Sequence, residues 1–495
     1  MKLFHKLKML TYTDWICLLL ILYILKIVFS YISSYSTDIQ GVEFAFLHNI
    51  QLLRKHQHLY SNPDNYPFYL IFYPPLYSYF TEHLTEAFKI NPFVSIHELL
   101  VGMRSLSLFF TLLNGWIMLR ILKLLSVRSS KRILLYLLFL LTLTLHIFAA
   151  RPDSFKLFFF LLFLTKALRY TFIKQKKSTL LAATIYAVIC IYIKHDAIIY
   201  ILAYWFIYFL YFKKKNAIIA VSLLFFFILW GLSICNSHLG TDFFRNIFYY
   251  NIQYSSDIRV NLIFILINVI RFTPLLYITW LNLKSENSTC KFLAALAFIY
   301  FLLSNLTMLR PGANLNYTNE SAVLLMVNLG IYLHDNAIRW KLKYEIILII
   351  LLTISCPYVK LNPDILNKTK SANEKTAYMS NLKNGDSLTE IIGADTVFFT
   401  NPKYTIFNAK LNLLYGYDIH FDRYSELYFG VTIKPDIYSN EISKAYDRYF
   451  TNGTVKYIVA EDVPKATAQM TKYYPLYLYY QKTGNLIVYK FNKTN

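Results

Sequence analysis

The first apolar stretch, "WICLLLILYILKIVFSYISSY" (15–35), decides which class of protein this is. Lys26 is the only charged residue in this stretch. The stretch also has the ~20 residues that a bilayer-crossing helix needs. Similar runs recur as far as residue 358, and a signal peptide would explain only one of them. The chain of 495 residues is 56% hydrophobic and 18% aromatic, which is too apolar for a soluble domain of this length. The sequence therefore predicts a multi-pass membrane protein.

The apolar runs divide into eleven predicted transmembrane helices. Lys2, Lys6 and Lys8 precede the first one, which places the N-terminus in the cytoplasm. With strict alternation, the loops on the cytoplasmic side are all basic, whereas acids and mixed charge pairs collect on the outer side. The net charge of +22 is then a sign of membrane topology, and we expect no nucleic-acid partner. The predicted spans are 15–35, 101–123, 133–150, 154–172, 178–194, 197–212, 216–236, 260–283, 291–309, 319–335 and 344–358.

After residue 358 the pattern changes to short apolar runs. "TVFFT" (396–400), "KYIVA" (456–460) and "NLIVYKF" (485–491) have strand length, and "SNEISKAYDRYF" (439–450) has helical spacing after a Ser start signal. The predicted fold class is thus mainly α, a polytopic helix bundle with a small C-terminal α/β domain outside the membrane. We expect two domains, 1–358 and 359–495. The five cysteines are scattered singly and show neither a disulfide framework nor metal-ligand spacing.

The first outer loop, 36–100, is long where most of the other loops are short, and long loops are usually functional. Val42, Phe46, Ile50 and Leu53 recur at steps of three and four residues, which predicts a helix lying in the membrane interface. "YPPLY" (73–77) then imposes a stiff segment. Its two tyrosines, Tyr73 and Tyr77, are candidate walls for a lipid or a sugar, although ordinary interfacial tyrosines fit the pattern equally well.

Four groups of ionisable residues are predicted on the outer side, although such groups are costly at a bilayer. Carboxylates together with cations suit a site that binds an anionic lipid headgroup and needs a base. The groups are Asp38 with Glu43; Arg151 with Asp153; Lys194, His195 and Asp196; and Arg310 with Glu320.

Each group also has a purely structural explanation. Thr37 and Gln40 have capping-box spacing, which would make Asp38 a favourable first-turn acid. "RPD" (151–153) is a good helix start, and "KHD" (194–196) fits a tight polar turn. Lys156, one turn into a span, is explained by snorkelling. A divalent metal is conceivable near the acids, but no ligand spacing indicates one and no cofactor is required.

The order of these motifs resembles the GT-C superfamily of membrane glycosyltransferases. It is most similar to the bacterial relatives of the protein O-mannosyltransferases and to the aminoarabinose transferases of lipid A. The likeness covers roughly residues 10–335. It rests on "TDIQGVEFAFLHNIQLLRKHQHLY" (37–60), "FYPPLYSYF" (72–80), "ARPDSFKLFFFLLF" (150–163), "IKHDAIIYILAYWFIYFLYFKKK" (193–215) and "RPGANLNYTNESAVLL" (310–325).

The resemblance implies an acidic residue at the active site in the first outer loop and a polyprenyl-phosphate sugar as the donor. Asp38 matches that position, but Ile39 stands where the family often has a second acid. Glu43 is the weaker candidate for this second acid. Five residues along a helix rotate a side chain by ~500°, so Glu43 and Asp38 would not point in the same direction on a continuous helix. Asp38 would then be the general base of an inverting transfer.

The leaving lipid phosphate needs cations, and Arg151, Lys194, His195 and Arg310 are the candidates. Asp153 and Glu320 would bind sugar hydroxyls or orient those cations. We expect an acceptor glycan, lipid or protein at the outer face of a bacterial inner membrane. A transporter or lipid flippase without bond cleavage is the alternative, although no duplicated halves are visible. A sugar-chain polymerase or ligase of the envelope is a third class.

Overall fold

The computed structural model describes residues 11–36, 43–62, 64, 71, 73–127, 131–143, 145–212, 214–239, 242–249, 258–309, 315–336, 342–355, 368–414, 440–464, 466–467, 470 and 474–492. The chain divides into two units, and each is assembled from separate chain segments. Unit 1 comprises Met1–Ser33, Arg104–Leu229 and Asp257–Asn367, and unit 2 comprises Ser34–Met103, Trp230–Ser256 and Lys368–Asn495. The predicted domain boundary after residue 358 stays a prediction.

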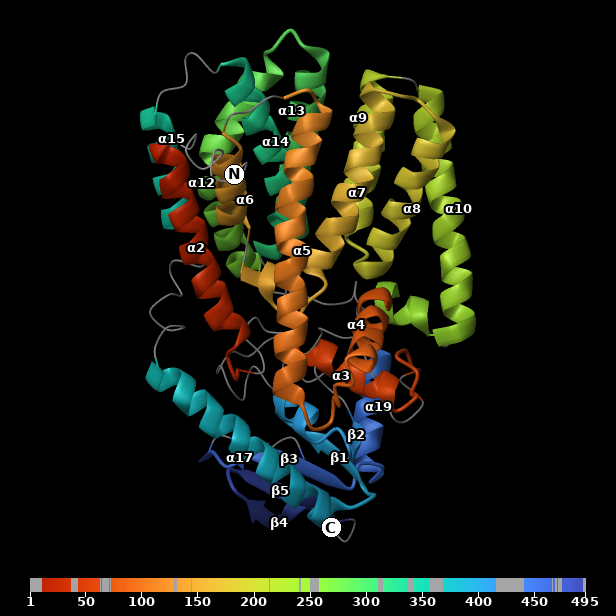
Figure 1. Ribbon diagram of the computed structural model, residues 1–495. Helices are drawn as coiled ribbons and strands as arrows, with labels where there is room; N and C mark the ends of the chain where they lie inside the picture. Colours follow the sequence, from red (N-terminus) through yellow and green to blue (C-terminus); the bar gives the residue numbers. More distant parts are fainter. Residues whose placement is uncertain are drawn as a thin grey trace. The chain divides into compact units, whose positions relative to one another are not determined.

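Unit 1 is helical, and α14 is its most deeply buried helix. Nearly every side chain from Asn319 to Leu333 is buried, and a helix that is apolar on all sides belongs in an interior. Gly330 permits a close approach, since a Cβ there would lie 2.7 Å from Leu122 Cδ2 of α5. The helices are α2 (Tyr12–Ile32), α5 (Ile96–Leu124, from Arg104 on), α6 (Arg132–Thr142), α7 (Asp153–Phe172), α8 (Lys177–Ile193), α9 (Ala197–Tyr211), α10 (Lys214–Leu239, to Leu229), α12 (Ile258–Leu283), α13 (Ser288–Thr307), α14 (Asn319–Asp335) and α15 (Leu342–Ser355) (Figure 1).

The predicted span 133–150 is wrong in one respect, because it is broken. α6 ends at Thr142, and a short 3-10 helix, η1 (Leu145–Phe148), follows it. The broken end exposes helix carbonyls that need donors. Arg271 of α12 supplies them, donating from Nη2 to the Leu141 carbonyl at 2.8 Å and to the Leu143 carbonyl at 3.1 Å. A buried arginine thus stabilises a break that apolar periodicity does not predict.

Five of the described helices are long and apolar enough to cross a membrane: Tyr12–Ile32, Ile96–Leu124, Lys214–Ser237, Ile265–Leu283 and Ser288–Thr307. Arg132–Thr142, Lys177–Ile193 and Ala197–Tyr211 are apolar but shorter. The predicted count of eleven spans is therefore not confirmed.

Unit 2 joins the first outer loop to the C-terminal region. Its helical elements are α3 (Glu43–Arg54), α4 (Leu76–Ala87), the start of α5, the π-helical turn η2 (Arg245–Tyr249), α17 (Lys368–Ile392), the 3-10 helix η4 (Pro402–Phe407) and α19 (Asn440–Thr451). α3 packs against α4 and also against η4, which lies some 350 residues later in the chain. The outer loop and the C-terminal region therefore share one core.

A five-stranded sheet forms the centre of the C-terminal region, in the order β2-β1-β3-β5-β4. β1 runs parallel to β2 and β3, while β5 is antiparallel to β3 and β4. The strands are β1 (Thr396–Phe399), β2 (Asn412–Leu414), β3 (Tyr457–Glu461), β4 (Tyr477–Thr483) and β5 (Leu486–Phe491).

Both faces of this sheet are covered. Alternate residues such as Phe398 and Ile458 pack with Tyr449 and Phe450 of α19 on one face. Their neighbours, such as Val397, pack with α17 on the other face, where Figure 1 shows that helix lying along the strands. The small C-terminal α/β part is confirmed, and β1, β3, β5 and α19 lie where the sequence predicts them. The polar helix α17 and strand β4, which has five exposed residues in succession, were not predicted.

Candidate active site

Two of the predicted site residues, Asp38 and Arg310, lie outside the described residues. The others divide between the two units. Arg151, Asp153, Lys194, His195 and Glu320 belong to unit 1, and Glu43, Tyr73 and Tyr77 belong to unit 2.

In unit 1, the predicted motifs meet at the ends of three helices. Arg151 precedes α7, and Pro152 is its N-cap residue, so that Asp153 opens the helix where an acid favours the positive end of the helix dipole. Lys194 and Asp196 lie in the short connection between α8 and α9. Glu320 lies in the first turn of α14. Residues that are far apart in the sequence thus converge on one buried charge network.

The network is a continuous set of ion pairs. The Asp153 carboxylate binds two cations, Arg151 Nε at 3.2 Å through Oδ2 and Lys194 Nζ at 2.9 Å through Oδ1. Lys194 Nζ also lies 3.8 Å from Asp196 Oδ2.

Lys156 completes the set, because its Nζ lies 3.1 Å from Asp196 Oδ2 and 2.7 Å from Glu320 Oε1. The six residues of the charge network are Arg151, Asp153, Lys156, Lys194, Asp196 and Glu320.

Burial makes this network costly unless the charges compensate one another. Arg151 is its most exposed side chain at 7%, and Lys156, Asp153 and Glu320 are completely buried. Three basic side chains face three carboxyl groups, and such mutual pairing is the arrangement that buried charges require.

In the connection between α8 and α9, the neighbouring charges shift the pKa values of Lys194 and Asp196. Burial opposes charge on Lys194, but Asp153 and Asp196 nevertheless raise its pKa above the ordinary value. Burial likewise opposes charge on Asp196, and Lys156 and Lys194 hold its pKa below the ordinary value.

Polar and aromatic groups surround the network. Lys194 Nζ lies 4.7 Å from the centre of the Tyr317 ring, a cation–π contact. The Tyr200 hydroxyl donates to the Tyr317 carbonyl at 2.8 Å. Asn319, next to Glu320, is fully buried, and neither of its amide atoms has a hydrogen-bond partner among the described residues. The same holds for the Ser154 hydroxyl next to Asp153. Buried polar groups of this kind are rare and call for a partner.

Sequence reasoning found four members of the network and missed the role of a fifth. The predicted snorkelling of Lys156 is wrong, because its side chain is fully buried and bound to two carboxylates. The available signal was its position three residues after Asp153, on the same face of α7. Asp196 was named with its group but not chosen for a role. His195 lies between the two network residues of its connection and is half-buried.

Glu43 begins α3, which lies where the sequence predicts a helix, and its location in the membrane interface stays a prediction. The helix is buried on its polar side as well, since Glu43, His48, Asn49 and Gln51 are all buried. Specific partners explain this burial. Gln51 Nε2 donates to the carbonyls of Pro92 at 2.9 Å and Ile406 at 2.8 Å, and Asn49 Nδ2 donates to Ser78 Oγ at 3.2 Å. α3 is therefore a core helix of unit 2.

Tyr73 and Tyr77 both pack against Phe46 of α3. The ring centroids lie 5.0 Å apart for Tyr73 and 5.2 Å apart for Tyr77, whose ring meets Phe46 edge to face. Tyr77 is buried, and the Tyr73 carbonyl accepts from the Tyr60 hydroxyl at 2.7 Å. These contacts give both tyrosines a packing role in unit 2.

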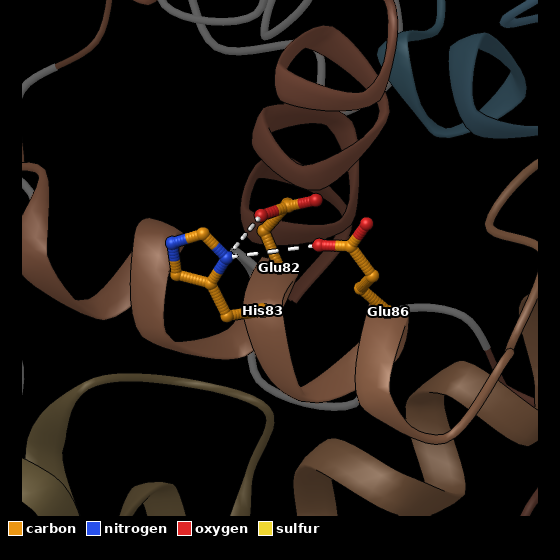
Figure 2. A group of neighbouring side chains, drawn as sticks. All are labelled: Glu82, His83 and Glu86. Atoms are coloured by element: carbon orange, nitrogen blue, oxygen red, sulfur yellow. Dashed lines mark ion pairs between the residues drawn. The ribbon is translucent and has the colours of Figure 1, made fainter.

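One group in unit 2 has the donor atoms of a metal site. Glu82, His83 and Glu86 of α4 each offer one atom, and these atoms lie within 4.8 Å of one another. Figure 2 shows the imidazole turned toward both carboxylates, with His83 Nδ1 3.2 Å from Glu82 Oε2. One imidazole and two carboxylates suit a divalent transition metal. However, Arg54 already binds this group, with Nε 3.0 Å from Glu82 Oε1, so a metal would compete with a positive charge.

Comparison with known proteins shows likeness of structure without likeness of sequence. No family model and no curated protein matches the chain. ArnT from Cupriavidus metallidurans, solved with undecaprenyl phosphate bound, is similar with a TM-score of 0.58 and 10% identity over 97% of this chain and 98% of that one. The Archaeoglobus fulgidus oligosaccharyltransferase in its apo form is similar with a TM-score of 0.52 and 12% identity over 96% of this chain and 75% of that one.

A second structure of the archaeal enzyme, AglB from Archaeoglobus fulgidus with an inhibitory peptide and a dolichol-phosphate, has a TM-score of 0.51 and 12% identity, over 95% of this chain and 74% of that one. These similarities span nearly the whole chain and show that it shares the fold of those structures. With the apolar helices, they make the chain a membrane protein of that architecture.

Proposed function

We propose that the chain is a glycosyltransferase that moves a sugar from a polyprenyl-phosphate donor to a lipid, glycan or protein acceptor at the outer face of a bacterial inner membrane. The observation that carries this proposal is the buried charge network of unit 1. It gathers the "RPD", "KHD" and "NE" motifs at helix ends, in a fold shared with structures that hold undecaprenyl phosphate or dolichol-phosphate.

The network holds two cations in fixed positions, where they can bind the leaving phosphate. Asp153 holds Arg151 and Lys194 through separate oxygens, so the two cations keep their positions before the substrate binds. Charges held in advance stabilise developing negative charge without reorganising during the reaction. We assign phosphate binding to Arg151, Lys194 and His195, and retain Arg310 as a further cation. Asp153 is a positioning residue.

Lys156 and Glu320 then have different roles from those of the phosphate-binding residues. Lys156 is enclosed by Asp196 and Glu320, and it holds α7, α14 and the α8–α9 connection together. Asn319 and Ser154, whose side-chain polar atoms have no partner among the described residues, offer hydrogen bonds to sugar hydroxyls beside this network.

The reaction is an inverting displacement. Asp38 takes the proton from an acceptor hydroxyl or amine, whose oxygen or nitrogen forms a bond to the anomeric carbon. The bond between that carbon and the lipid phosphate breaks, and the phosphate leaves with the electron pair. The assignment of Asp38 rests on its place at the exit of the first span and on the family resemblance.

A labelled donor tests the proposal directly. Protein purified in detergent is given a polyprenyl-phosphate sugar and a membrane extract as the source of acceptor, and released polyprenyl phosphate is measured. We expect Asp38→Asn to slow release by about a hundredfold or more, because general bases contribute ~10²–10⁴ in rate.

The matched control is Asp386→Asn, which removes an exposed carboxylate from α17 and should leave release unchanged. Unfolding curves of both variants verify that they fold. Normal turnover by the Asp38 variant would contradict the catalytic assignment, and movement of intact lipid without release would favour a flippase.

A further inference from the structure

The Glu82–His83–Glu86 group of α4 is not part of the proposed catalytic machinery. Glu82 and Glu86 are one helical turn apart on the same face, and His83 is a neighbour of both, next to Glu82 and three residues before Glu86. α4 is anchored by its packing against α3, which includes the hydrogen bond from Asn49 to Ser78. One turn of an anchored helix therefore supplies all three donor atoms.

Arg54 of α3 divides the oxygens of the two carboxylates into two sets. Its Nε lies 3.0 Å from Glu82 Oε1, and its Nη1 lies 3.7 Å from Glu86 Oε1. The two Oε2 atoms instead face His83 Nδ1, which lies 3.2 Å from the Oε2 of Glu82 and 3.9 Å from that of Glu86 (Figure 2). Arg54 and a metal would therefore use different oxygens. Ligating carboxylates that are also hydrogen-bonded by an outer group are typical of metal sites.

The charges of the group favour a further cation. Among the described residues, Arg54 and His83 are the only ion-pair partners of these two carboxylates. With a neutral imidazole, two carboxylates and one guanidinium leave one negative charge in excess. Like charges one helical turn apart repel each other. His83 is 72% and Glu86 63% exposed, so an ion from the solvent has access to the group.

A protonated His83 accounts for only part of this geometry. Nδ1 carries a single hydrogen, so it can donate a well-aligned hydrogen bond to one of the two carboxylates and not to both. A zinc ion bonded to all three atoms at ~2.0–2.2 Å would set them about 3.4 Å apart in a tetrahedron. The two observed distances from Nδ1, 3.2 Å and 3.9 Å, lie on either side of that spacing. No two of the three donor atoms are more than 4.8 Å apart, so small side-chain rotations close the site.

We propose that Glu82, His83 and Glu86 bind a divalent transition-metal ion, of which zinc fits best. One imidazole nitrogen and two carboxylate oxygens are donors that zinc accepts, whereas magnesium and calcium prefer oxygens alone. Three protein donors leave at least one coordination position open to water or to a second ligand. The proposal concerns unit 2 alone and does not depend on the transferase proposal.

Calorimetric titration of the full chain in detergent tests the proposal, with zinc chloride and magnesium chloride as the probes. The purification tag is cleaved first, and bound metal is removed with EDTA and dialysis. We expect one zinc ion per chain in the tightest binding step. Zinc should bind at least about tenfold more tightly than magnesium, because the imidazole nitrogen is a poor ligand for magnesium.

The variants His83→Gln and Glu86→Gln should each weaken zinc binding by about tenfold or more. Loss of a group that merely orients a metal ligand costs ~10–100-fold in affinity, and these variants remove a ligand itself. Both side chains are exposed, so the substitutions should not prevent folding, which unfolding curves verify.

The matched controls are His58→Gln and Glu390→Gln, which remove an exposed imidazole and an exposed carboxylate elsewhere in unit 2. Both should bind zinc like the parent chain. Equal affinities for zinc and magnesium, or an unchanged zinc affinity in His83→Gln, would each overturn the proposal. Because the titration contains no donor, either result leaves the release of polyprenyl phosphate to be decided by the donor assay.

Discussion

The charge network of unit 1 and the Glu82–His83–Glu86 group of unit 2 both place carboxylates beside basic side chains at similar distances. They differ in burial, since no network side chain is more than 7% exposed, whereas His83 is 72% and Glu86 63% exposed. A buried charge that loses its partner keeps its full desolvation cost, while an exposed one is solvated by water. The same pairing is thus a strong structural constraint in one unit and a weak one in the other.

The largest expected effect on stability comes from removing one carboxylate of the charge network. Asp153→Ala leaves both Arg151 and Lys194 without their shared carboxylate, and we expect the free energy of unfolding to fall by about 3–5 kcal/mol. Denaturant titration in mixed micelles measures it. The double variant Asp153→Ala/Lys194→Met should lose less than the single one, because one unpaired cation is removed with the acid. A loss in the double variant equal to the sum of the two single losses would show that the pair is not coupled.

A smaller effect is the pH dependence of stability that a buried histidine of unit 2 contributes. Burial, with a further contribution from Lys55, lowers the pKa of His48 from 6.5 to about 3, whereas His83 is exposed. Below pH 6.5 the unfolded chain therefore binds a proton that folded His48 does not, so stability falls as the pH falls from 6.5 toward 3.

Over pH 6.5 to 5 we expect His48 to contribute a loss of about 1–2 kcal/mol, with a slope of at most ~1.4 kcal/mol per pH unit. Unfolding curves across that window should become flatter in His48→Gln. An unchanged slope in His48→Gln would mean that its buried form is not neutral.

The smallest effect is expected on α4 itself. Glu86→Gln removes the carboxylate that lies 3.7 Å from Arg54 Nη1, and because Glu86 is 63% exposed we expect a loss of only about 0–1 kcal/mol. Thermal unfolding at low and high salt measures this difference, which salt should reduce further. A destabilisation as large as that of Asp153→Ala would remove the distinction between the two regions.

The sequence predicts four charged groups on one side of the membrane, and members of three of them meet in the network, because charged groups at a bilayer are costly and need partners. Glu43, from the fourth group, belongs to unit 2. Arg151, Asp153, Lys194 and Glu320 do lie in one network. The burial of Lys156 could not be predicted from the sequence, since a lysine one turn into a span fits snorkelling and burial equally well. Only the fold shows that α14 brings Glu320 to within 2.7 Å of it.

The sequence predicts well those helices and strands that follow from a local pattern of apolar residues. It predicts poorly those features that depend on contacts with residues far away in the chain. Apolar length located the helices, and alternating burial located β1, β3 and β5. The break after α6 depends on a donor from α12, and the burial of α3 depends on Pro92 and Ile406. Neither long-range contact leaves a local pattern in the sequence.

The discontinuity of unit 2 has a consequence for biosynthesis. Gln51, made early, donates to the carbonyl of Ile406, which a ribosome adds 355 residues later. Ser34 similarly awaits Glu374, whose carboxylate accepts from its hydroxyl at 2.8 Å. The outer loop must therefore remain incompletely folded while every intervening membrane helix is inserted. Truncation before α17 would deprive the beginning of the chain of these partners, and quality-control proteases would encounter an exposed loop at the opposite end from the lesion.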